Sequence, residues 1–426
     1  MERAELARLL GGTAKLHAAR HILISETEPR KFMTAFAQAV VGDAEIFLCD
    51  PKWGSAERAQ VDALLCRGAG PDKSRPASRP ERDAPGYPLG YLMIPTGGTG
   101  GRVRFARHDG ATIAAAVQGF VRHFDLAQVN AAGVLPLHHV SGLMAWMRCV
   151  LTGGQFRPLD WKAIEGGALP PLPVKIHGWV LSLVPTQLER LLHRAAAVDW
   201  LRKFRIIFLG GGPTWPELLD QAAALKLPLS PGYGMTESAA MLAALRPEEF
   251  LAGGRSCGTI LPHATVQISS DRRISVSGES LFRGYYPLWR TGDSFATEDG
   301  GWLEKGEYLH VTGRRDTVII TGGEKVDPEE VATVLRSSGE LPDVVVLGVP
   351  DSEWGQVIIA VYPESAQPRL KKVGEVMNRR LAPAKRPKLF VPLTNWPVND
   401  EGKVNRTEVV RLAELALQSG IGRFKN

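Results

Sequence analysis

Short apolar runs and longer amphipathic runs alternate between residues 90 and 213 of this chain. The runs of strand length are followed by runs in which apolar residues recur at helical spacing. The strand-like runs are 90–96, 131–137, 179–184 and 204–209, and the helical runs are 111–126, 140–154 and 185–196. This alternation predicts an α/β domain with a largely parallel sheet.

The pattern changes twice toward the C-terminus. From about residue 255, short strands with frequent turns predict a β-rich subdomain. After residue 313, Asp327 can cap a helix that begins at Pro328. Acidic residues in the first turn and one apolar face complete this helix: Glu329, Glu330, Val331, Val334 and Leu335. With the strand-like runs 343–350 and 356–363, it predicts a small C-terminal α+β domain.

Composition narrows the class of protein. The chain has 426 residues, of which 44% are hydrophobic and 23% charged, as in a globular protein of two or three domains. No apolar run is long enough for a membrane span, and the N-terminal stretch MERAELARLLGG lacks the apolar core of a signal peptide. The four cysteines are scattered, which indicates reduced thiols and no metal pair. We expect a cytoplasmic protein.

Charge argues against nucleic acid as a partner. The 51 basic and 45 acidic residues are interspersed, and no basic arm is present. The net charge of +6 also suits polyanionic small molecules.

The stretch TGGTGG at 96–101, followed by Arg102 and Arg104, is the first candidate for chemistry. It lacks the Lys-Ser/Thr ending of a Walker A loop, and Val103 stands where a dinucleotide-binding loop needs its third glycine. Successive backbone N–H groups and threonine hydroxyls can nevertheless converge on an anion. The loop is interpreted as a phosphate site, with a tight turn and incidental arginines as the alternative.

Five further stretches accompany this loop along the chain. They are GGGP (210–213), GYGMTES (232–238), RTGD (290–293), GRRDTVIITGGEKVDPEEV (313–331) and NDEGKVNR (399–406). In order and spacing, the set resembles the motifs of the adenylate-forming acyl- and aryl-CoA synthetase superfamily over roughly residues 90–410. The loop departs from the family pattern at Gly97, Gly100, Val103 and Arg104, where arginine keeps the positive charge of the usual lysine.

The resemblance implies a site for ATP and Mg²⁺. The residues implied for the phosphates are Thr96, Gly98, Thr99 and Gly101, and those implied beside the adenine are Gly211, Gly212 and Tyr233. Thr236 is implied to meet the α-phosphate, Glu237 to ligate Mg²⁺, and Asp293 to accept the ribose hydroxyls. Taken alone, the Glu237 motif also fits a turn that starts a helix.

The resemblance also implies a mobile C-terminal lid. Arg314 would contact the nucleotide, Asp316 would act as the hinge within 314–316, and Gly322 and Gly323 would line the pantetheine channel of coenzyme A. Lys403 would be the catalytic lysine, bridging the carboxylate and the α-phosphate. Its alternative is a solvated surface lysine. We therefore expect domains over 1–313, with the β-rich subdomain at about 255–313, and over 317–426.

The segments 135–154 and 181–192 are similar to those of the o-succinylbenzoate–CoA ligases, which make a menaquinone or phylloquinone precursor. This likeness implies that four residues lie near the acid substrate: His139, Ser141, Arg148 and Thr186. Arg148 can balance the second carboxylate of a dicarboxylic acid, and its alternative is a helix-surface arginine. His139 is either a border of the acyl site or a hydrogen-bonded core histidine.

The expected reaction converts o-succinylbenzoate, ATP and coenzyme A into o-succinylbenzoyl-CoA, AMP and diphosphate, with Mg²⁺ as the metal. Two alternatives stay open. One is a CoA ligase for another aryl or medium-chain acid, which would share every nucleotide motif. The other is a nucleotide-binding regulatory protein without catalysis, against which the presence of both Glu237 and Lys403 speaks. The sequence does not fix the oligomeric state, and a homodimer is one option.

Overall fold

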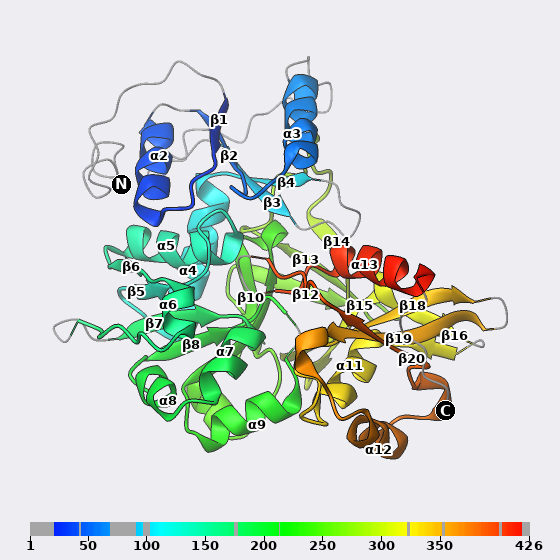
Figure 1. The fold of residues 1–426 in the computed structure, drawn as a ribbon. Coiled ribbons are helices and arrows are strands. Elements are labelled where there is room, and N and C mark those ends of the chain that lie inside the picture. The colour runs from blue at the N-terminus through cyan, green and yellow to red at the C-terminus, as the bar shows by residue number, and fades with distance from the viewer. Residues whose placement is uncertain are drawn as a thin grey trace. The chain divides into compact units, whose positions relative to one another are not determined.

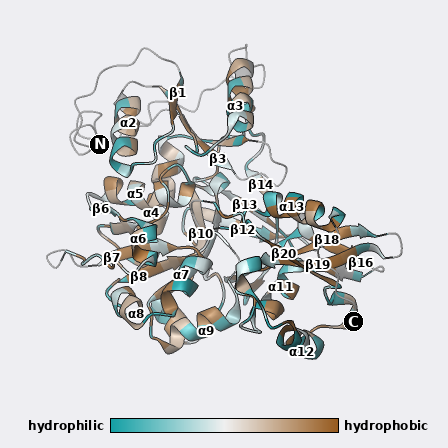
Figure 2. Ribbon diagram, in the orientation of Figure 1, coloured by the Kyte–Doolittle hydropathy of each residue, from teal (hydrophilic) through white to brown (hydrophobic). Residues whose placement is uncertain are grey.

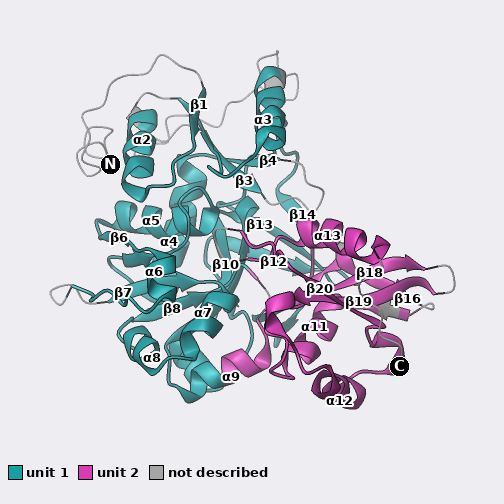
Figure 3. Cartoon of the chain, in the orientation of Figure 1, with its two compact units in different colours: residues 1–211, 221–297, 302–310 teal, residues 212–220, 298–301, 311–426 magenta. Residues whose placement is uncertain are grey.

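The computed structural model describes residues 21–41, 44–68, 91–96, 103–173, 178–212, 214–321, 324–351, 354–399 and 403–419. The chain divides into two compact units (Figure 3). Unit 1 holds residues 1–211, 221–297 and 302–310, and unit 2 holds residues 212–220, 298–301 and 311–426. The domain boundary and hinge expected at 314–316 stay predictions.

Unit 1 begins with a four-stranded sheet in the order β1-β2-β3-β4 (Figure 1). Its strands are β1 (His21–Ile24), β2 (Glu45–Leu48), β3 (Leu92–Thr96) and β4 (Arg104–His108), with helices α2 (Pro29–Val41) and α3 (Ser55–Gly68). The first three strands are parallel, while β4 returns antiparallel to β3. Thr96 pairs with Arg104 across this hairpin, so the glycine stretch connects two neighbouring strands.

The second sheet has eleven strands in the order β12-β13-β14-β15-β11-β10-β9-β8-β7-β5-β6. The bounds of its parallel strands are β5 (Asn130–Gly133), β6 (Phe156–Pro158), β7 (Trp179–Leu183), β8 (Ile206–Leu209) and β9 (Leu229–Met235). The β-rich part adds β10 (Ala240–Ala244), β11 (Thr259–Ile260), β12 (Ala264–Ile268), β13 (Arg273–Gly278), β14 (Ser294–Glu304) and β15 (Tyr308–Arg314). The predicted change from a parallel to a β-rich region is thus confirmed.

Helices cover the parallel strands. They are α4 (Gly110–Phe124), α5 (Val140–Thr152), α6 (Trp161–Glu165), α7 (Pro185–Leu192), α8 (Ala195–Leu201), α9 (Pro216–Ala224) and α10 (Pro247–Leu251). One core cluster joins α4 and α5 to the four-stranded sheet, with Trp146 among its buried residues. Another joins the same two helices to the large sheet around Phe120 and Phe208. Helices α4 and α5 therefore lie between two sheets.

Unit 2 contains a three-stranded sheet and a two-stranded one. The strands are β16 (Ile319–Thr321), β17 (Glu324–Val326), β18 (Val345–Asp351), β19 (Gly355–Pro363) and β20 (Leu389–Leu393), and the helices are α11 (Pro328–Arg336), α12 (Leu370–Arg380) and α13 (Arg406–Gln418). Strands β18 and β19 are coloured mainly as apolar in Figure 2. One core cluster packs α11 and α12 on the three-stranded sheet, and a second packs α13 on it.

Helix α11 begins where the sequence predicts. Asp327 caps α11, and its carboxylate accepts the Glu329 backbone N–H at 2.8 Å. Val331, Val334 and Leu335 are buried. The strand expected at 131–137 is shorter, since β5 ends at Gly133. Residues beyond it, including Pro136, which has no N–H for a sheet, form the turn into α5.

Candidate active site

The turn that carries Glu237 follows β9 directly. Thr236, Glu237 and Ser238 form a single 3₁₀ turn, labelled η1 (Thr236–Ser238), between β9 and β10. The Ser238 hydroxyl lies 2.8 Å from the Ala240 carbonyl oxygen, to which it can donate, and the Phe282 N–H donates to the Glu237 carbonyl oxygen at 2.8 Å. Because Phe282 is distant from Glu237 in sequence, the turn is fixed in part by a long-range contact within unit 1.

The carboxylate of Glu237 is nearly buried, and one of its oxygens is already engaged. The Tyr285 hydroxyl donates to Oε1 at 2.5 Å, while Oε2 has no hydrogen-bond partner among the residues that the structure describes. The Arg104 guanidinium lies 4.7 Å from the centre of the Tyr285 ring. Arg104, at the end of the glycine hairpin, thus contacts the Tyr285 ring, and the Tyr285 hydroxyl in turn contacts Glu237.

Tyr285 occupies this position because its segment pairs with β4. The Arg107 N–H donates to the Gly284 carbonyl at 2.9 Å, and Ala106 forms a bridge with Tyr285. On the facing strand, the Thr96 hydroxyl is buried without a partner among the described residues. A buried hydroxyl is normally hydrogen-bonded. Thr96 therefore offers a donor at the base of the proposed phosphate loop.

His108 forms a hydrogen bond with the backbone of Thr236. Its Nε2 lies 2.8 Å from the Thr236 carbonyl oxygen and its Nδ1 lies 3.1 Å from the Thr112 hydroxyl. Burial lowers the pKa of His108 to about 4, so the imidazole is neutral at pH 7. A neutral ring with Nε2–H as the donor satisfies the carbonyl without adding charge.

Asp109 caps α4 beside this histidine. Its carboxylate accepts from the Thr112 N–H at 2.9 Å and pairs with Arg283 at 2.8 Å. Burial raises the pKa of Asp109, but hydrogen bonding and the charge of Arg283 outweigh it and leave the pKa below its usual range. Arg283 lies two residues before Tyr285, so this ion pair also anchors the segment that reaches Glu237.

The glycine turn at 210–212 lies next to the YGMTE strand. A Cβ on Gly210 would lie 3.3 Å from the Gly232 carbonyl oxygen, and Gly211 has a φ of 77°, which glycine adopts readily. In β9, a Cβ on Gly234 would lie 1.9 Å from the Ala240 carbonyl oxygen. Both Gly211 and Gly212 are exposed, and Tyr233 is half-buried in β9 between two glycines.

Asp293 belongs to an exposed turn before β14. The turn is organised by Arg290, whose Nε donates to the Phe282 carbonyl at 3.1 Å and which also bonds the Gly292 carbonyl. Phe282 in turn bonds the Glu237 backbone. These hydrogen bonds therefore connect Gly292, the neighbour of the implied ribose acceptor Asp293, with the backbone of the implied Mg²⁺ ligand Glu237.

Arg148 is buried in the middle of α5, so its interpretation as a helix-surface arginine is wrong. Its side chain lies between rings, with the guanidinium carbon 3.9 Å from the centre of Phe120 and 5.8 Å from that of Phe208. Burial lowers the pKa of Arg148 to about 10. Among the described residues, no carboxylate pairs with it and its Nε has no hydrogen-bond partner. Within the described part of the chain, the guanidinium therefore has no anionic partner.

The other residues expected near the acid lie at helix starts. His139 is the N-cap of α5 and Ser141 lies in its first turn, while Thr186 follows Pro185 in the first turn of α7. All three are partly exposed. His139 is therefore not a fully buried core histidine, and its ring lies tilted by 44° against that of His138, with ring centres 4.4 Å apart.

The residues of the expected lid belong to unit 2. Lys403 is partly exposed in a tight turn: its backbone N–H donates to Asn399 Oδ1 at 2.9 Å, and its carbonyl accepts from the Asn399 N–H at 2.8 Å. Arg314 ends β15, and Asp316 lies in the 3₁₀ turn η2 (Arg315–Thr317). Gly98, Thr99, Gly101, Gly322 and Gly323 lie outside the described residues.

Tyr285 and His108 are not among the residues predicted from the sequence. Both act on the Glu237 turn across long sequence distances, with Tyr285 48 residues from Glu237 and His108 128 residues from Thr236. A local signal existed for His108, which directly precedes the helix cap Asp109. No helix in the described part of unit 1 or unit 2 has the length and apolarity needed to cross a bilayer.

Comparisons with known proteins identify the family of this chain. Residues 18–286 match the AMP-binding enzyme family. The chain is 31% identical over 285 residues to the 2-succinylbenzoate–CoA ligase of Oceanobacillus iheyensis, covering 64% of this chain and 59% of the relative. It is 30% identical over 332 residues to the ligase of the same name from Bacillus licheniformis, covering 73% and 68%. The chain thus spans about 59% of the length of the first relative.

Solved structures agree on the fold. The o-succinylbenzoate CoA synthetase of Bacillus subtilis, in complex with the acyl-adenylate OSB-AMP, matches with a TM-score of 0.74 at 23% identity, covering 96% of this chain and 90% of the other. ATP-bound MatB from Rhodopseudomonas palustris also matches with a TM-score of 0.74, at 18% identity, covering 97% and 92%. The predicted fold class, a large α/β domain followed by a small α+β domain, is confirmed. The chain belongs to the AMP-binding enzyme family.

Proposed function

We propose that this chain is an ATP-dependent acid–thiol ligase that activates o-succinylbenzoate as an acyl-adenylate and transfers it to coenzyme A. The products are o-succinylbenzoyl-CoA, AMP and diphosphate. Membership of the AMP-binding family supports the adenylation step, and the relatives named 2-succinylbenzoate–CoA ligase support the acid. A place in menaquinone biosynthesis and a cytoplasmic location follow from that reaction, and a homodimer is kept as the proposed assembly.

The burial of Arg148 is the observation that supports o-succinylbenzoate as the acid. A buried guanidinium without a carboxylate partner is costly, and an anionic ligand would remove that cost. The rings of Phe120 and Phe208 beside it would suit an aromatic acid. o-Succinylbenzoate supplies both features, because it has an aromatic ring with one carboxylate and a second carboxylate that reacts with ATP. His139, Ser141 and Thr186 are proposed to border the rest of the acyl group.

Mg²⁺ fits the oxygen donors at Glu237. Tyr285 occupies Oε1 and leaves Oε2 for a hard cation, and the Thr236 hydroxyl lies next to it in the chain. Mg²⁺ bound there with ATP would neutralise phosphate charge. We assign Thr96, Gly98, Thr99 and Gly101 to the phosphates.

Around the nucleoside, Gly211, Gly212 and Tyr233 are proposed to lie beside the adenine. Asp293 and Arg314 are proposed to bind the ribose and the rest of the nucleotide. A carboxylate with two acceptor oxygens suits the two ribose hydroxyls.

Residues 317–426 are proposed to act as a lid that turns about Asp316. Lys403 would be near the α-phosphate during adenylation, where a cation offsets the repulsion between the attacking carboxylate and the phosphate. A different lid position, with Gly322 and Gly323 along the pantetheine arm, would serve thioester formation.

The test is a reaction of the full chain with ATP, Mg²⁺, coenzyme A and a panel of acids that includes o-succinylbenzoate. We expect diphosphate release and a thioester of the mass of o-succinylbenzoyl-CoA. A thioester formed only with another aryl or medium-chain acid would keep the ligase and overturn the acid. No diphosphate release with any acid would overturn the enzyme and favour a nucleotide-binding regulatory protein.

A further inference from the structure

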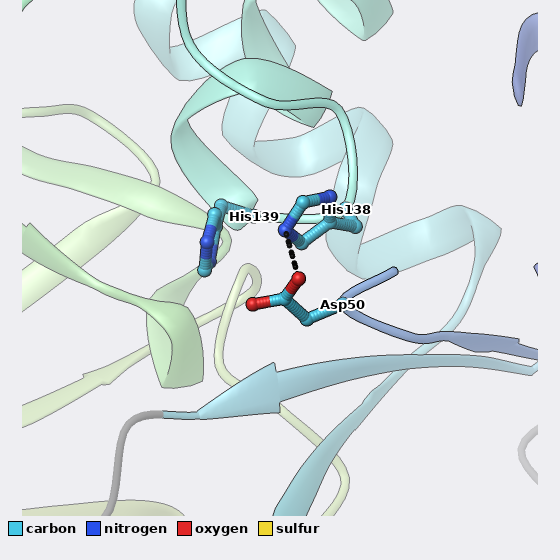
Figure 4. A group of neighbouring side chains, drawn as sticks. All are labelled: Asp50, His138 and His139. Atoms are coloured by element: carbon cyan, nitrogen blue, oxygen red, sulfur yellow. Dashed lines mark ion pairs between the residues drawn. The ribbon is translucent and has the colours of Figure 1, made fainter. Parts of the chain in front are cut away.

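Three side chains with metal-binding groups meet at one end of the four-stranded sheet. Asp50, His138 and His139 each offer one ligand atom, and these atoms all lie within 4.8 Å of one another. Figure 4 shows the Asp50 carboxylate between the two imidazoles, with His138 Nε2 3.8 Å from Asp50 Oδ1. No other such group of three occurs among the residues described by the structure.

The Asp50 carboxylate is held in place by the backbone two residues further along the chain. Asp50 follows the end of β2, where the Cys49 N–H bonds the Ile24 carbonyl at 2.8 Å. Its Oδ1 also accepts the Lys52 N–H at 2.8 Å. Metal-binding carboxylates in proteins are commonly held by such additional hydrogen bonds. Its side chain is 20% exposed, so an ion can reach it.

The turn that enters α5 carries both histidines and fixes the backbone of His139. The His139 N–H donates to the Pro136 carbonyl at 3.2 Å, and the His139 carbonyl accepts the Leu143 N–H at 2.9 Å. A Cβ on Gly142 would lie 2.2 Å from the Pro136 carbonyl oxygen, so the helix start packs closely on this turn. The three donors therefore come from two ordered segments of unit 1 that are distant in sequence.

The donor set favours a transition metal over Mg²⁺. Two imidazoles and one carboxylate are typical ligands of Zn²⁺, whereas Mg²⁺ takes oxygen ligands and keeps several waters. Zn²⁺ binds nitrogen and oxygen at about 2.0–2.2 Å, which places two ligands of one ion roughly 3.3 Å apart in a tetrahedron. The 3.8 Å between His138 Nε2 and Asp50 Oδ1 is too long for a direct N–H···O hydrogen bond. Since all three ligand atoms lie within 4.8 Å of one another, each pair would have to approach by roughly 1.5 Å or less to reach that spacing.

We propose that Asp50, His138 and His139 bind one divalent transition-metal ion, with Zn²⁺ as the best match, at a site distinct from the Mg²⁺ position at Glu237. Three protein ligands leave a fourth position on the ion for water or an anion. The start of α5, which His139 caps, favours an anion there because of the exposed N–H groups. The proposal does not depend on ligase activity.

The test measures metal binding to the full chain without ATP or Mg²⁺. The metal-stripped protein is titrated with Co²⁺, whose visible spectrum reports histidine coordination, and Zn²⁺ affinity is measured by competition with a chromophoric chelator. We expect one ion per chain, and a loss of affinity of at least about tenfold in both Asp50→Asn and His138→Gln. Asp50→Asn keeps the side-chain shape, and its thermal unfolding checks that the fold is retained.

Two matched variants exclude other sites. His310→Gln removes an imidazole that pairs with Glu304 at 2.9 Å on the surface, and Glu237→Gln removes the proposed Mg²⁺ ligand. Both should bind Zn²⁺ as the unaltered protein does. The proposal is overturned if the unaltered protein binds no Zn²⁺, or if Asp50→Asn and His138→Gln bind it as tightly as His310→Gln.

Discussion

Replacing Arg148 by methionine should separate stability from choice of substrate. Methionine keeps an unbranched apolar stem against the rings of Phe120 and Phe208 but removes the buried charge. The ligand-free protein should become more stable, because the guanidinium has no carboxylate partner among the described residues. The same change should weaken the use of a dicarboxylic acid. Loss of an ordinary structural arginine would lower stability instead.

The magnitude follows from the buried charge. An ordinary arginine titrates at about 12.5 and each pKa unit is worth about 1.36 kcal/mol, so a pKa of about 10 for Arg148 corresponds to burial disfavouring its charge by about 3 kcal/mol. The contact with the Phe120 ring returns about 0.5–2 kcal/mol. We expect Arg148→Met to raise the free energy of unfolding by about 1–2.5 kcal/mol. A charge-assisted hydrogen bond to the acid is worth about 1.5–3 kcal/mol, so kcat/KM should fall roughly 10- to 150-fold.

The assay pairs denaturant unfolding with kinetics on two acids. The second acid is 4-oxo-4-phenylbutanoate, which keeps the reacting carboxylate and lacks the one on the ring. Arg148→Met should lose activity on o-succinylbenzoate and keep it on this analogue, while Arg148→Lys keeps a charge without the planar fork and should fall between. Equal losses on both acids, or a less stable protein, would refute an anion-binding role for Arg148.

Three further predictions concern the rest of unit 1 and the lid. Lys403→Ala should slow diphosphate release on the order of 10²–10³-fold while sparing thioester formation from preformed acyl-adenylate; equal loss of both half-reactions would contradict lid rotation. Tyr285→Phe should raise the Mg²⁺ concentration for half-maximal diphosphate release by roughly tenfold, and Tyr286→Phe, the control, should not. Burial lowers the pKa of His108 to about 4. As pH falls below about 6.5, this histidine therefore binds a proton in the unfolded chain before it does so in the folded protein. The free energy of unfolding should consequently drop by up to about 3 kcal/mol between pH 6.5 and 4. His108→Gln should flatten that slope in denaturant titrations, and an unchanged slope would contradict a buried neutral imidazole.

Local features of the fold were predictable because their causes are local. The cap at Asp327 with Pro328 after it defines the start of α11 by hydrogen bonding within one turn. The glycines at 210–212 end β8 because Gly211 takes a positive φ. Most strand and helix runs between 90 and 213 follow from side-chain periodicity. The exceptions are the length of β5, the run 185–196, which the structure divides into α7 and α8, and the short elements β4, β6 and α6, which were not predicted.

The setting of Arg148 could not be predicted from its neighbours in sequence. Every residue of α5 from Gly142 to Cys149 is buried, because the helix lies between the four-stranded sheet and the eleven-stranded one. A helix covered by one sheet would have left one face in water, and an arginine in its sequence would belong there. Strands β1 and β2 of the smaller sheet lie more than fifty residues before α5. The periodicity of α5 itself therefore carries no information about this second sheet that covers it. The Tyr285–Glu237 contact was out of reach for the same reason.

The two sides of the candidate site are built on opposite principles. The Glu237 turn is held by His108 at Thr236, by Tyr285 at the carboxylate and by Phe282 at the backbone, and the next two residues, Ala239 and Ala240, have positive φ of 53° and 78°. Such backbone costs about 1–3 kcal/mol per residue and persists only where surrounding contacts enforce it. Glu237, the proposed metal ligand, is thereby held in place by the protein alone. Arg148 is the reverse, since burial disfavours its charge and the proposed acid would supply the anion. Substitutions around Glu237 should therefore reduce turnover with every acid, whereas substitutions around Arg148 should change which acid is used.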